Sequence, residues 1–167
     1  MDLIVTEDNG QAFLDWGAGK RRCAVGRAGI GDKRGEGDNI TPRGAWPLRG
    51  LFYRADRIAA PQCIFTPAAL RPNDGWCDAP GDPNYNRLVS LPYAASHEAM
   101  WRFDHLYDLV LVIGYNDDPV VPGKGSAIFL HLARPDFAPT EGCVAVTLGD
   151  ALAALAQLGE GDRIRIG

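Results

Sequence analysis

The sequence lacks any long apolar run and any long basic run. Its longest purely aliphatic stretch covers residues 109–113, far fewer than the roughly 20 residues that a membrane-spanning helix needs. Lysine and arginine number 17 against 21 aspartates and glutamates, which gives a net charge of -4. Without a basic patch, binding to the phosphate backbone of a nucleic acid has little support. We expect a protein that neither spans a membrane nor binds nucleic acid.

Patterns typical of zinc and nucleotide sites are also missing. None of the four cysteines lies in a C-x-x-C pair, and the three histidines are widely spaced, so we predict no metal site. The glycine-rich residues 29–38 carry Arg34 where the dinucleotide-binding pattern needs glycine, and they lack the Gly-Lys-Ser/Thr of a phosphate loop. We therefore predict a plain loop at these residues, and no cofactor.

Glycine and proline are abundant. The 20 glycines and 12 prolines among 167 residues exceed their ordinary share of roughly 12%, which favours many turns over a helical bundle. A hydrophobic content of 46% excludes a disordered chain. The length suits one domain with a sizeable core, so residues 1–167 are expected to form a single domain.

Short apolar-rich segments separated by turn residues predict strands. They cover residues 2–6, 11–16, 21–27, 109–115, 126–131 and 163–166. Helical spacing of apolar residues occurs over 149–158 and over 96–107. The pattern predicts a mainly β fold with one or two short helices.

Half of the prolines fall between Pro61 and Pro92. We interpret this stretch, within residues 60–95, as a packed irregular loop that is either a cover over a site or structural padding. Cys63 and Cys77 flank part of it. They are either reduced thiols, which we favour, or a disulfide.

Chemistry is indicated where His131 ends an apolar strand and Cys143 follows twelve residues later. A thiol attacks a carbonyl as the thiolate, so a neighbouring imidazole must take its proton and hold the ion pair. Gly142 permits an unusual backbone angle, and the amides of Gly142 and Cys143 are candidate donors for an oxyanion hole. The alternative is a buried structural cysteine and a histidine with no catalytic part.

Two motifs carry a resemblance to a known family. Residues 129–131 followed by residues 140–144, Thr-Glu-Gly-Cys-Val, resemble the signature of the YkuD-type L,D-transpeptidases. In that family a histidine on a strand precedes a Ser/Thr-His-Gly-Cys segment. Upstream, Lys33, Gly37-Asp38 and residues 41–46 look like the family's segment with a Thr-Pro-x-Gly core. The resemblance implies a YkuD-like β-sandwich catalytic domain.

This sequence departs from the family pattern at several points. The spacing between His131 and Cys143 is shorter than usual, Glu141 replaces the histidine beside the glycine, and Ala145 stands where a polar or basic residue is common. Nucleophile, base and glycine carry over, whereas the contacts that position the donor do not. The sequence therefore resembles a divergent proteobacterial branch of the family.

The resemblance implies an enzyme that cross-links peptidoglycan without metal or organic cofactor. Cys143 would attack a stem-peptide carbonyl, His131 would act as general base and then as acid, and a diaminopimelate amine of a neighbouring stem would resolve the thioester. The link is either 3-3, between two diaminopimelates, or 1-3, from L-alanine to diaminopimelate. Because the residues that usually position the donor stem peptide are replaced here, both link types remain alternatives.

Five further residues are candidates for binding the substrate. Thr140 is expected to shape the loop before the nucleophile. Arg134 is either a ligand for a substrate carboxylate or a solvated loop arginine. Tyr115 and Asn116 face the same pocket if their strand pairs with that of His131, or else they form a structural turn. His105 lies just before that strand.

Two other functions remain open. A hydrolase, an L,D-carboxypeptidase or endopeptidase, would use water in place of the acceptor amine at the same site. A cell-wall binding domain with a dead site would use neither residue for chemistry. We expect a monomer acting on stem peptides in the periplasm because cross-linking takes place there, although residues 1–7 resemble no secretory signal and a cytosolic location stays open.

Overall fold

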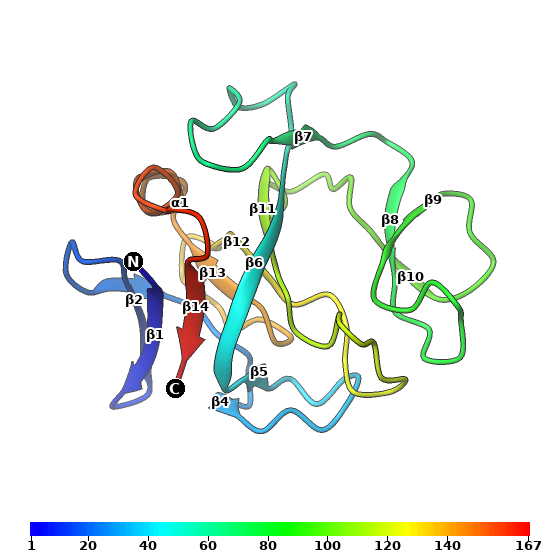
Figure 1. The fold of residues 1–167 in the computed structure, drawn as a ribbon, viewed down its shortest axis with the longest axis horizontal. Helices are drawn as coiled ribbons and strands as arrows, with labels where there is room; N and C mark the ends of the chain where they lie inside the picture. The colour runs from blue at the N-terminus through cyan, green and yellow to red at the C-terminus, as the bar shows by residue number, and fades with distance from the viewer.

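The computed structural model describes residues 1–167, and strands dominate it (Figure 1). The strands are β1 (Leu3–Asp8), β2 (Gln11–Asp15), β3 (Arg21–Cys23), β4 (Ile30–Gly31), β5 (Thr41–Pro42), β6 (Gly44–Tyr53), β7 (Ala68–Ala69), β8 (Asp74–Cys77), β9 (Leu88–Ser90), β10 (His97–Ala99), β11 (Leu109–Ile113), β12 (Phe129–Leu132), β13 (Val144–Val146) and β14 (Arg163–Ile166). The one helix is α1 (Leu148–Leu155). The prediction of a mainly β fold is confirmed.

Most strands belong to one strongly curved sheet. Its order is β13-β12-β11-β6-β14-β1-β2-β3, with β7 added beside β6. The chain just after β3 returns to β13, where Ala24 and Ala145 exchange two backbone hydrogen bonds of 2.8 Å each. The curvature lets the two halves of the sheet face each other across a core, as the predicted β-sandwich requires.

The main core lies inside this sheet and follows from the alternation of side chains along its strands. In β1, Leu3 and Val5 are buried while Ile4 is exposed, and β14 buries Ile164 and Ile166 in the same way. The helix α1 adds Ala151, Ala154 and Leu155 to this core. Its first turn is capped by Thr147, which accepts a hydrogen bond from the amide of Asp150 at 3.1 Å.

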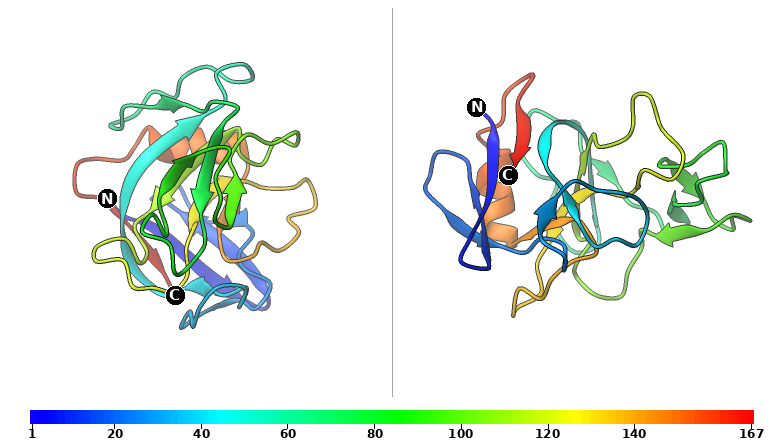
Figure 2. Two further views of the ribbon diagram at one scale, coloured as in Figure 1. Left: turned by 90° about the vertical axis from the view of Figure 1, so that its right-hand side faces the viewer. Right: turned by 90° about the horizontal axis from the view of Figure 1, so that it is seen from below.

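A second apolar cluster forms on the opposite face of β11 and β12. Residues 68–107, which we call the lobe, pack there and contain a small sheet of order β10-β8-β9 (Figure 2). Trp76 of the lobe meets Phe129 of β12 edge to face, with 5.1 Å between ring centroids. Both faces of β11 are therefore buried, which explains its uninterrupted apolar sequence.

The predicted helix over residues 96–107 is wrong. This segment contains β10 followed by turns, and Phe103 is fully exposed instead of facing a core. Two arginines hold its carbonyl groups: Arg54 donates to Arg102 O at 2.7 Å, and Arg57 donates to Asp104 O at 2.7 Å. Bonds from outside the segment thus replace the intrahelical bonds that the spacing suggested.

The proline-rich stretch is more regular than predicted. It carries β7, β8 and β9, and β8 is buried throughout at the centre of the small sheet. Cys63 and Cys77 both carry free thiols. Another strand, β6, runs for ten residues through Pro47 and Gly50, which the sequence pattern did not indicate.

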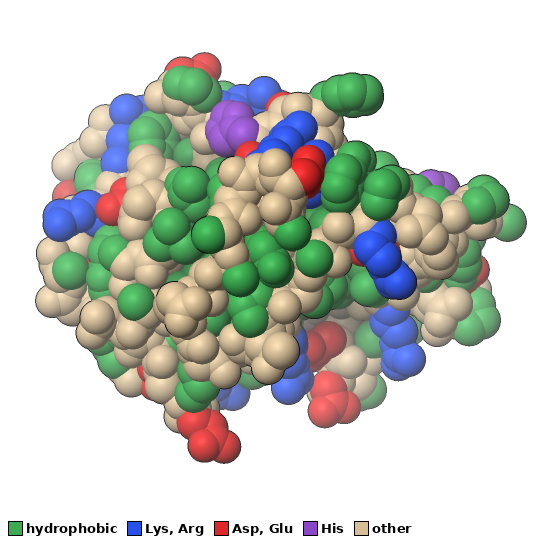
Figure 3. Space-filling view, turned by 90° about the horizontal axis from the view of Figure 1, so that it is seen from above, with side chains coloured by type: hydrophobic (Ala, Val, Ile, Leu, Met, Phe, Trp, Pro, Cys, Tyr) green, Lys and Arg blue, Asp and Glu red, His purple; other side chains and the backbone are tan.

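No helix of the structure could span a membrane, since α1 is the one helix and has only eight residues. On the face shown in Figure 3, acidic and basic side chains are interspersed. Neither sign forms a continuous patch on that face.

Candidate active site

The parallel pair of β12 and β13 places the two predicted catalytic residues on one face. His131 is the register partner of Ala145, and Cys143 lies two residues before Ala145, directly ahead of β13. The main-core side of the pair is occupied by Leu130, Leu132, Val144 and Val146. Because side chains alternate along strands, His131, Cys143 and Ala145 share the opposite face. The two residues are diagonal neighbours across the pair.

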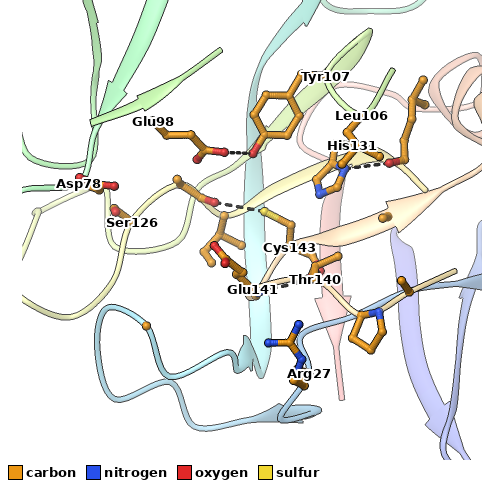
Figure 4. Close-up of a pocket in the computed structure, with 18 of the residues that line it drawn as sticks. Arg27, Asp78, Glu98, Leu106, Tyr107, Ser126, His131, Thr140, Glu141 and Cys143 are labelled. Atoms are coloured by element: carbon orange, nitrogen blue, oxygen red, sulfur yellow. Dashed lines mark hydrogen bonds between the residues drawn. The ribbon is translucent and has the colours of Figure 1, made fainter. Parts of the chain in front are cut away.

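This face lines a cavity of about 430 Å³ between the sheet and the lobe (Figure 4). Cys143, His131, Thr140 and Gly142 all line it. Its charged lining residues are Arg27, Lys33, Glu36, Asp78, Glu98, Arg102, Arg134 and Glu141. A cavity of this size, with polar groups converging on a thiol, can hold part of a peptide.

The thiol of Cys143 is held by backbone groups of β12 and of the segment just before it. Its Sγ donates to Ala127 O at 3.2 Å and accepts from the amide of Phe129 at 3.3 Å. Burial, and then the charge of Glu98, raise the pKa of Cys143 to about 12, against the lowering effect of the Phe129 amide and of Lys33. The thiol is therefore protonated at neutral pH.

The imidazole of His131 is oriented by its own chain. Its Nδ1 lies 3.0 Å from Leu132 O, and because a carbonyl only accepts, this nitrogen carries the proton. The other ring nitrogen, Nε2, is left with its lone pair and points to the side of Cys143 (Figure 4). Burial lowers the pKa of His131 to about 4. The expected thiolate–imidazolium pair is therefore not the resting state, because both groups are neutral.

The loop before Cys143 is organised by Thr140, as predicted. Its Oγ1 donates to Cys143 O at 2.7 Å and accepts from the amide of Gly142 at 3.1 Å. Gly142 has a φ of +142°, and a Cβ there would lie 3.0 Å from Ile40 O. Both the backbone angle and the space therefore require glycine.

Of the two amides predicted for an oxyanion hole, one is already engaged. The Gly142 amide donates to Thr140, so it would have to leave that partner to bind an oxyanion. The Cys143 amide makes no hydrogen bond within the protein. The nucleophile's own amide is thus the free donor beside the sulfur.

The basic residues of the cavity fall into two groups. Arg134 lines the cavity and forms no ion pair, which keeps it available to a carboxylate. Arg27, which no sequence motif indicated, also lines the cavity and forms no ion pair. Lys33 is engaged instead: its Nζ lies 2.6 Å from Asp38 Oδ1 and 3.3 Å from Ile40 O. Its Nζ would also lie 3.5 Å from a Cβ on Gly142, so the Lys33–Asp38 ion pair packs against the nucleophile loop.

Three of the predicted substrate-binding residues lie outside the cavity. Tyr115 donates its hydroxyl to Lys124 O at 2.7 Å, and Asn116 donates to Val121 O at 3.0 Å, so both close a structural turn. His105 lies 2.8 Å from Ala133 O through its Nε2 on the surface. β11 does pair with β12, but it ends at Ile113, before Tyr115 and Asn116.

The lobe contributes cavity residues that no local sequence motif predicted. Glu98 accepts a hydrogen bond from the hydroxyl of Tyr107, and the Tyr107 ring meets the His131 ring edge to face at 5.3 Å. Arg102 is held by Asp104 through two hydrogen bonds of 2.8 Å. These residues are far from Cys143 in the sequence, and only the packing of the lobe brings them to the cavity.

A buried thiol, a correctly oriented imidazole and a glycine-shaped loop together define a cysteine–histidine site capable of acyl transfer. Comparison with known families agrees with that class. Residues 3–166 match the family model YkuD, the L,D-transpeptidase catalytic domain. The match covers nearly the whole chain, and the protein therefore belongs to this family. No curated protein matches the sequence.

Proposed function

We propose that this protein is a peptidoglycan L,D-transpeptidase that works through a thioester on Cys143. The observation that carries the proposal is the placement of Cys143 beside an imidazole whose Nε2 lone pair is free, on one face of β12 and β13. Membership of the family supplies the substrate class, the stem peptides of peptidoglycan.

In the first half-reaction, the thiol exchanges its hydrogen bond to Ala127 O for one to His131 and gives its proton to Nε2. The sulfur attacks the donor carbonyl, and the new C–S bond places negative charge on the carbonyl oxygen near the Cys143 amide. The C–N bond then breaks, and His131 returns the proton to the leaving amine. The Phe129 amide stabilises the sulfur while it carries charge.

In the second half-reaction, a neutral amine from a neighbouring stem attacks the thioester carbon. His131 Nε2 takes a proton from that nitrogen as the C–N bond forms, and the C–S bond breaks. The proton then passes to the departing sulfur, which restores both neutral groups. Arg134 and Arg27, having no partner in the protein, bind carboxylates of the peptides. The acceptor amine belongs to diaminopimelate, and the product is a 3-3 or a 1-3 link.

We further propose that the protein acts in the periplasm as a monomer, since its substrate lies outside the inner membrane. The expected result of fractionating cells is that the protein co-purifies with periplasmic markers. Recovery in the cytosol would instead favour a part in recycling of stem peptides.

The test is incubation with purified disaccharide-peptides, read by mass spectrometry, with Cys143→Ala as the matched control. We expect an acyl-enzyme and cross-linked dimers from the native protein and neither from the variant, and fragmentation of the dimer separates a 3-3 from a 1-3 link. Shortened monomers alone would establish the hydrolase. If no product forms and a thiol reagent fails to label Cys143, the result would favour the alternative of a cell-wall binding domain with a dead site.

A further inference from the structure

Two carboxylates of the lobe face the cavity from one face of the small sheet. In the antiparallel pair of β8 and β10, Cys77 is the partner of His97, and the amide of Asp78 donates to Ser96 O at 3.1 Å. This register makes Asp78 and Glu98 diagonal neighbours with side chains on the same face. Both residues line the cavity that contains Cys143.

Neither carboxylate has a cation as its partner. Glu98 accepts a hydrogen bond only from the neutral Tyr107 hydroxyl. Arg102 is near enough for its charge to lower the pKa of Glu98, but its guanidinium is bound to Asp104. Burial has the larger effect and raises the pKa of Glu98. Asp78 forms no ion pair with any residue.

Two buried oxygen atoms at this place also lack hydrogen bonds. They are Asp78 Oδ1 and Ser126 Oγ, and the Ser126 residue is only 7% exposed. Figure 4 shows the Asp78 carboxylate beside the Ser126 hydroxyl, with the Glu98 carboxylate between them and Cys143. A buried polar atom without a hydrogen-bond partner costs free energy, commonly about 1–3 kcal/mol. Asp78 and Ser126 therefore favour a ligand that donates hydrogen bonds to these two oxygen atoms.

We propose that Asp78, Glu98 and Ser126 form a subsite for the alkylammonium group of the second substrate, which gives one proton to a carboxylate of the subsite and then attacks the thioester on Cys143 as the neutral amine. The inference rests on the proposed function, whose acceptor is an amine. A primary ammonium carries one charge and three N–H donors. The subsite offers negative charge and three acceptor groups, which match that donor set.

The subsite gives the enzyme a means of favouring an amine over water. Water is always in excess at the thioester, so transfer depends on holding the amine near the carbonyl carbon. In Figure 4 Arg27 lies below Cys143, apart from Asp78 at the left. Arg134, the other unpaired arginine of the lining, follows β12 and is not part of the lobe. Ammonium and carboxylate groups are therefore received at different places.

The first arm of the test measures binding and needs no turnover. The Cys143→Ala protein is titrated by NMR with Nα-acetyl-lysine amide, which carries one ammonium and no carboxylate, and with the uncharged Nα-acetyl-norleucine amide. Adding Asp78→Asn should weaken binding of the lysine compound about tenfold, as expected for a charged hydrogen bond. The ratio of the affinity for the lysine compound to that for the norleucine compound should fall by a similar factor. Equal affinities with and without the substitution would overturn the subsite.

The matched control is Asp118→Asn, which removes one negative charge from an exposed residue outside the cavity. It should leave both affinities unchanged. If Asp78→Asn fails to fold, as judged by circular dichroism, Glu98→Gln takes its place with the same expected loss.

The second arm follows the thioester of the otherwise native protein. Its aminolysis by Nα-acetyl-lysine amide is compared with that by hydroxylamine, which is uncharged at neutral pH. Asp78→Asn should lower the rate ratio of the two nucleophiles about tenfold. An unchanged ratio would show a merely structural role and overturn the proposal. If the native protein forms no thioester, the proposed function fails, while the binding arm still decides the subsite.

Discussion

The two walls of the cavity are built in different ways. The strand wall, residues 129–146, fixes its reactive groups through the backbone: Leu132 O orients His131, and the Phe129 amide contacts the Cys143 sulfur. The lobe wall, formed by lobe residues 78–107, relies on side chains, as in the bond from Tyr107 to Glu98. We infer that the strand wall carries the chemistry and that the lobe wall selects what reaches it.

The largest expected effect falls on the strand wall. In His131→Asn, the new amide can still donate to Leu132 O, but no base remains for the thiol. We expect the rate of acyl-enzyme formation to fall about 10²–10⁴-fold, the usual range for a general base. Rapid-quench mass spectrometry of the Cys143 thioester measures it. A loss of less than threefold would remove His131 from the mechanism and break the division between the walls.

The two walls also respond to pH with opposite signs. The pKa of His131 is about 4 in the folded protein and about 6.5 when unfolded, so the unfolded state binds more protons between these values. The free energy of unfolding should therefore fall by about 3 kcal/mol as pH drops from 6.5 towards 4. Burial raises the pKa of Glu98 above its ordinary 4.5, so its contribution is present below that pH and is lost as pH rises.

Urea unfolding at a series of pH values separates the two contributions. His131→Asn should remove the loss of about 3 kcal/mol between pH 6.5 and pH 4, whereas Glu98→Gln should make the native rise with pH steeper. If the stability of both variants changes with pH as that of the native protein does, neither residue is buried as described.

A third effect concerns the backbone of the strand wall. Gly142→Ala places a side chain at a φ of +142° and 3.0 Å from Ile40 O, which should cost about 1–3 kcal/mol. Gly149→Ala is the control, because it is exposed in α1 with open space around it and should gain up to about 1 kcal/mol. Thermal unfolding measures both, and equal shifts would argue against a constrained nucleophile loop.

The smallest effect is expected at the outer side of the lobe. Phe103 is fully exposed and lies outside the cavity, so Phe103→Ser should change stability by less than about 0.5 kcal/mol. Acyl-enzyme formation should also stay the same. A larger change in stability or in the rate of acyl-enzyme formation would show that lobe residues outside the cavity also affect the reaction or the fold.

The sequence predicted the strand wall better than the lobe wall for a physical reason. His131, Thr140, Gly142 and Cys143 lie within thirteen residues, so one motif and the alternation of a strand place them together. The main strands and α1 were predictable for the same reason, since their apolar periodicity is local.

The rest depends on contacts that no short segment contains. Glu98 reaches the cavity because β10 pairs with β8, and the turns after β10 exist because Arg54 and Arg57 bind their carbonyl groups. The same limit explains why the sequence left two alternatives for Tyr115 and Asn116, of which the structural turn is the one found, since local order along the chain does not show where a strand stops facing the cavity.

The position of β14 has a consequence for how the protein forms during synthesis. It is the last strand in chain order, yet it lies between β6 and β1 in the middle of the large sheet. The strands on either side of it cannot join until residues 163–166 have been made, and contacts between such distant segments form slowly. Until β14 has been made, a nascent chain can pair β6 with β11, β12 and β13 and can pair β1 with β2 and β3, but it cannot close the sheet that joins these two halves.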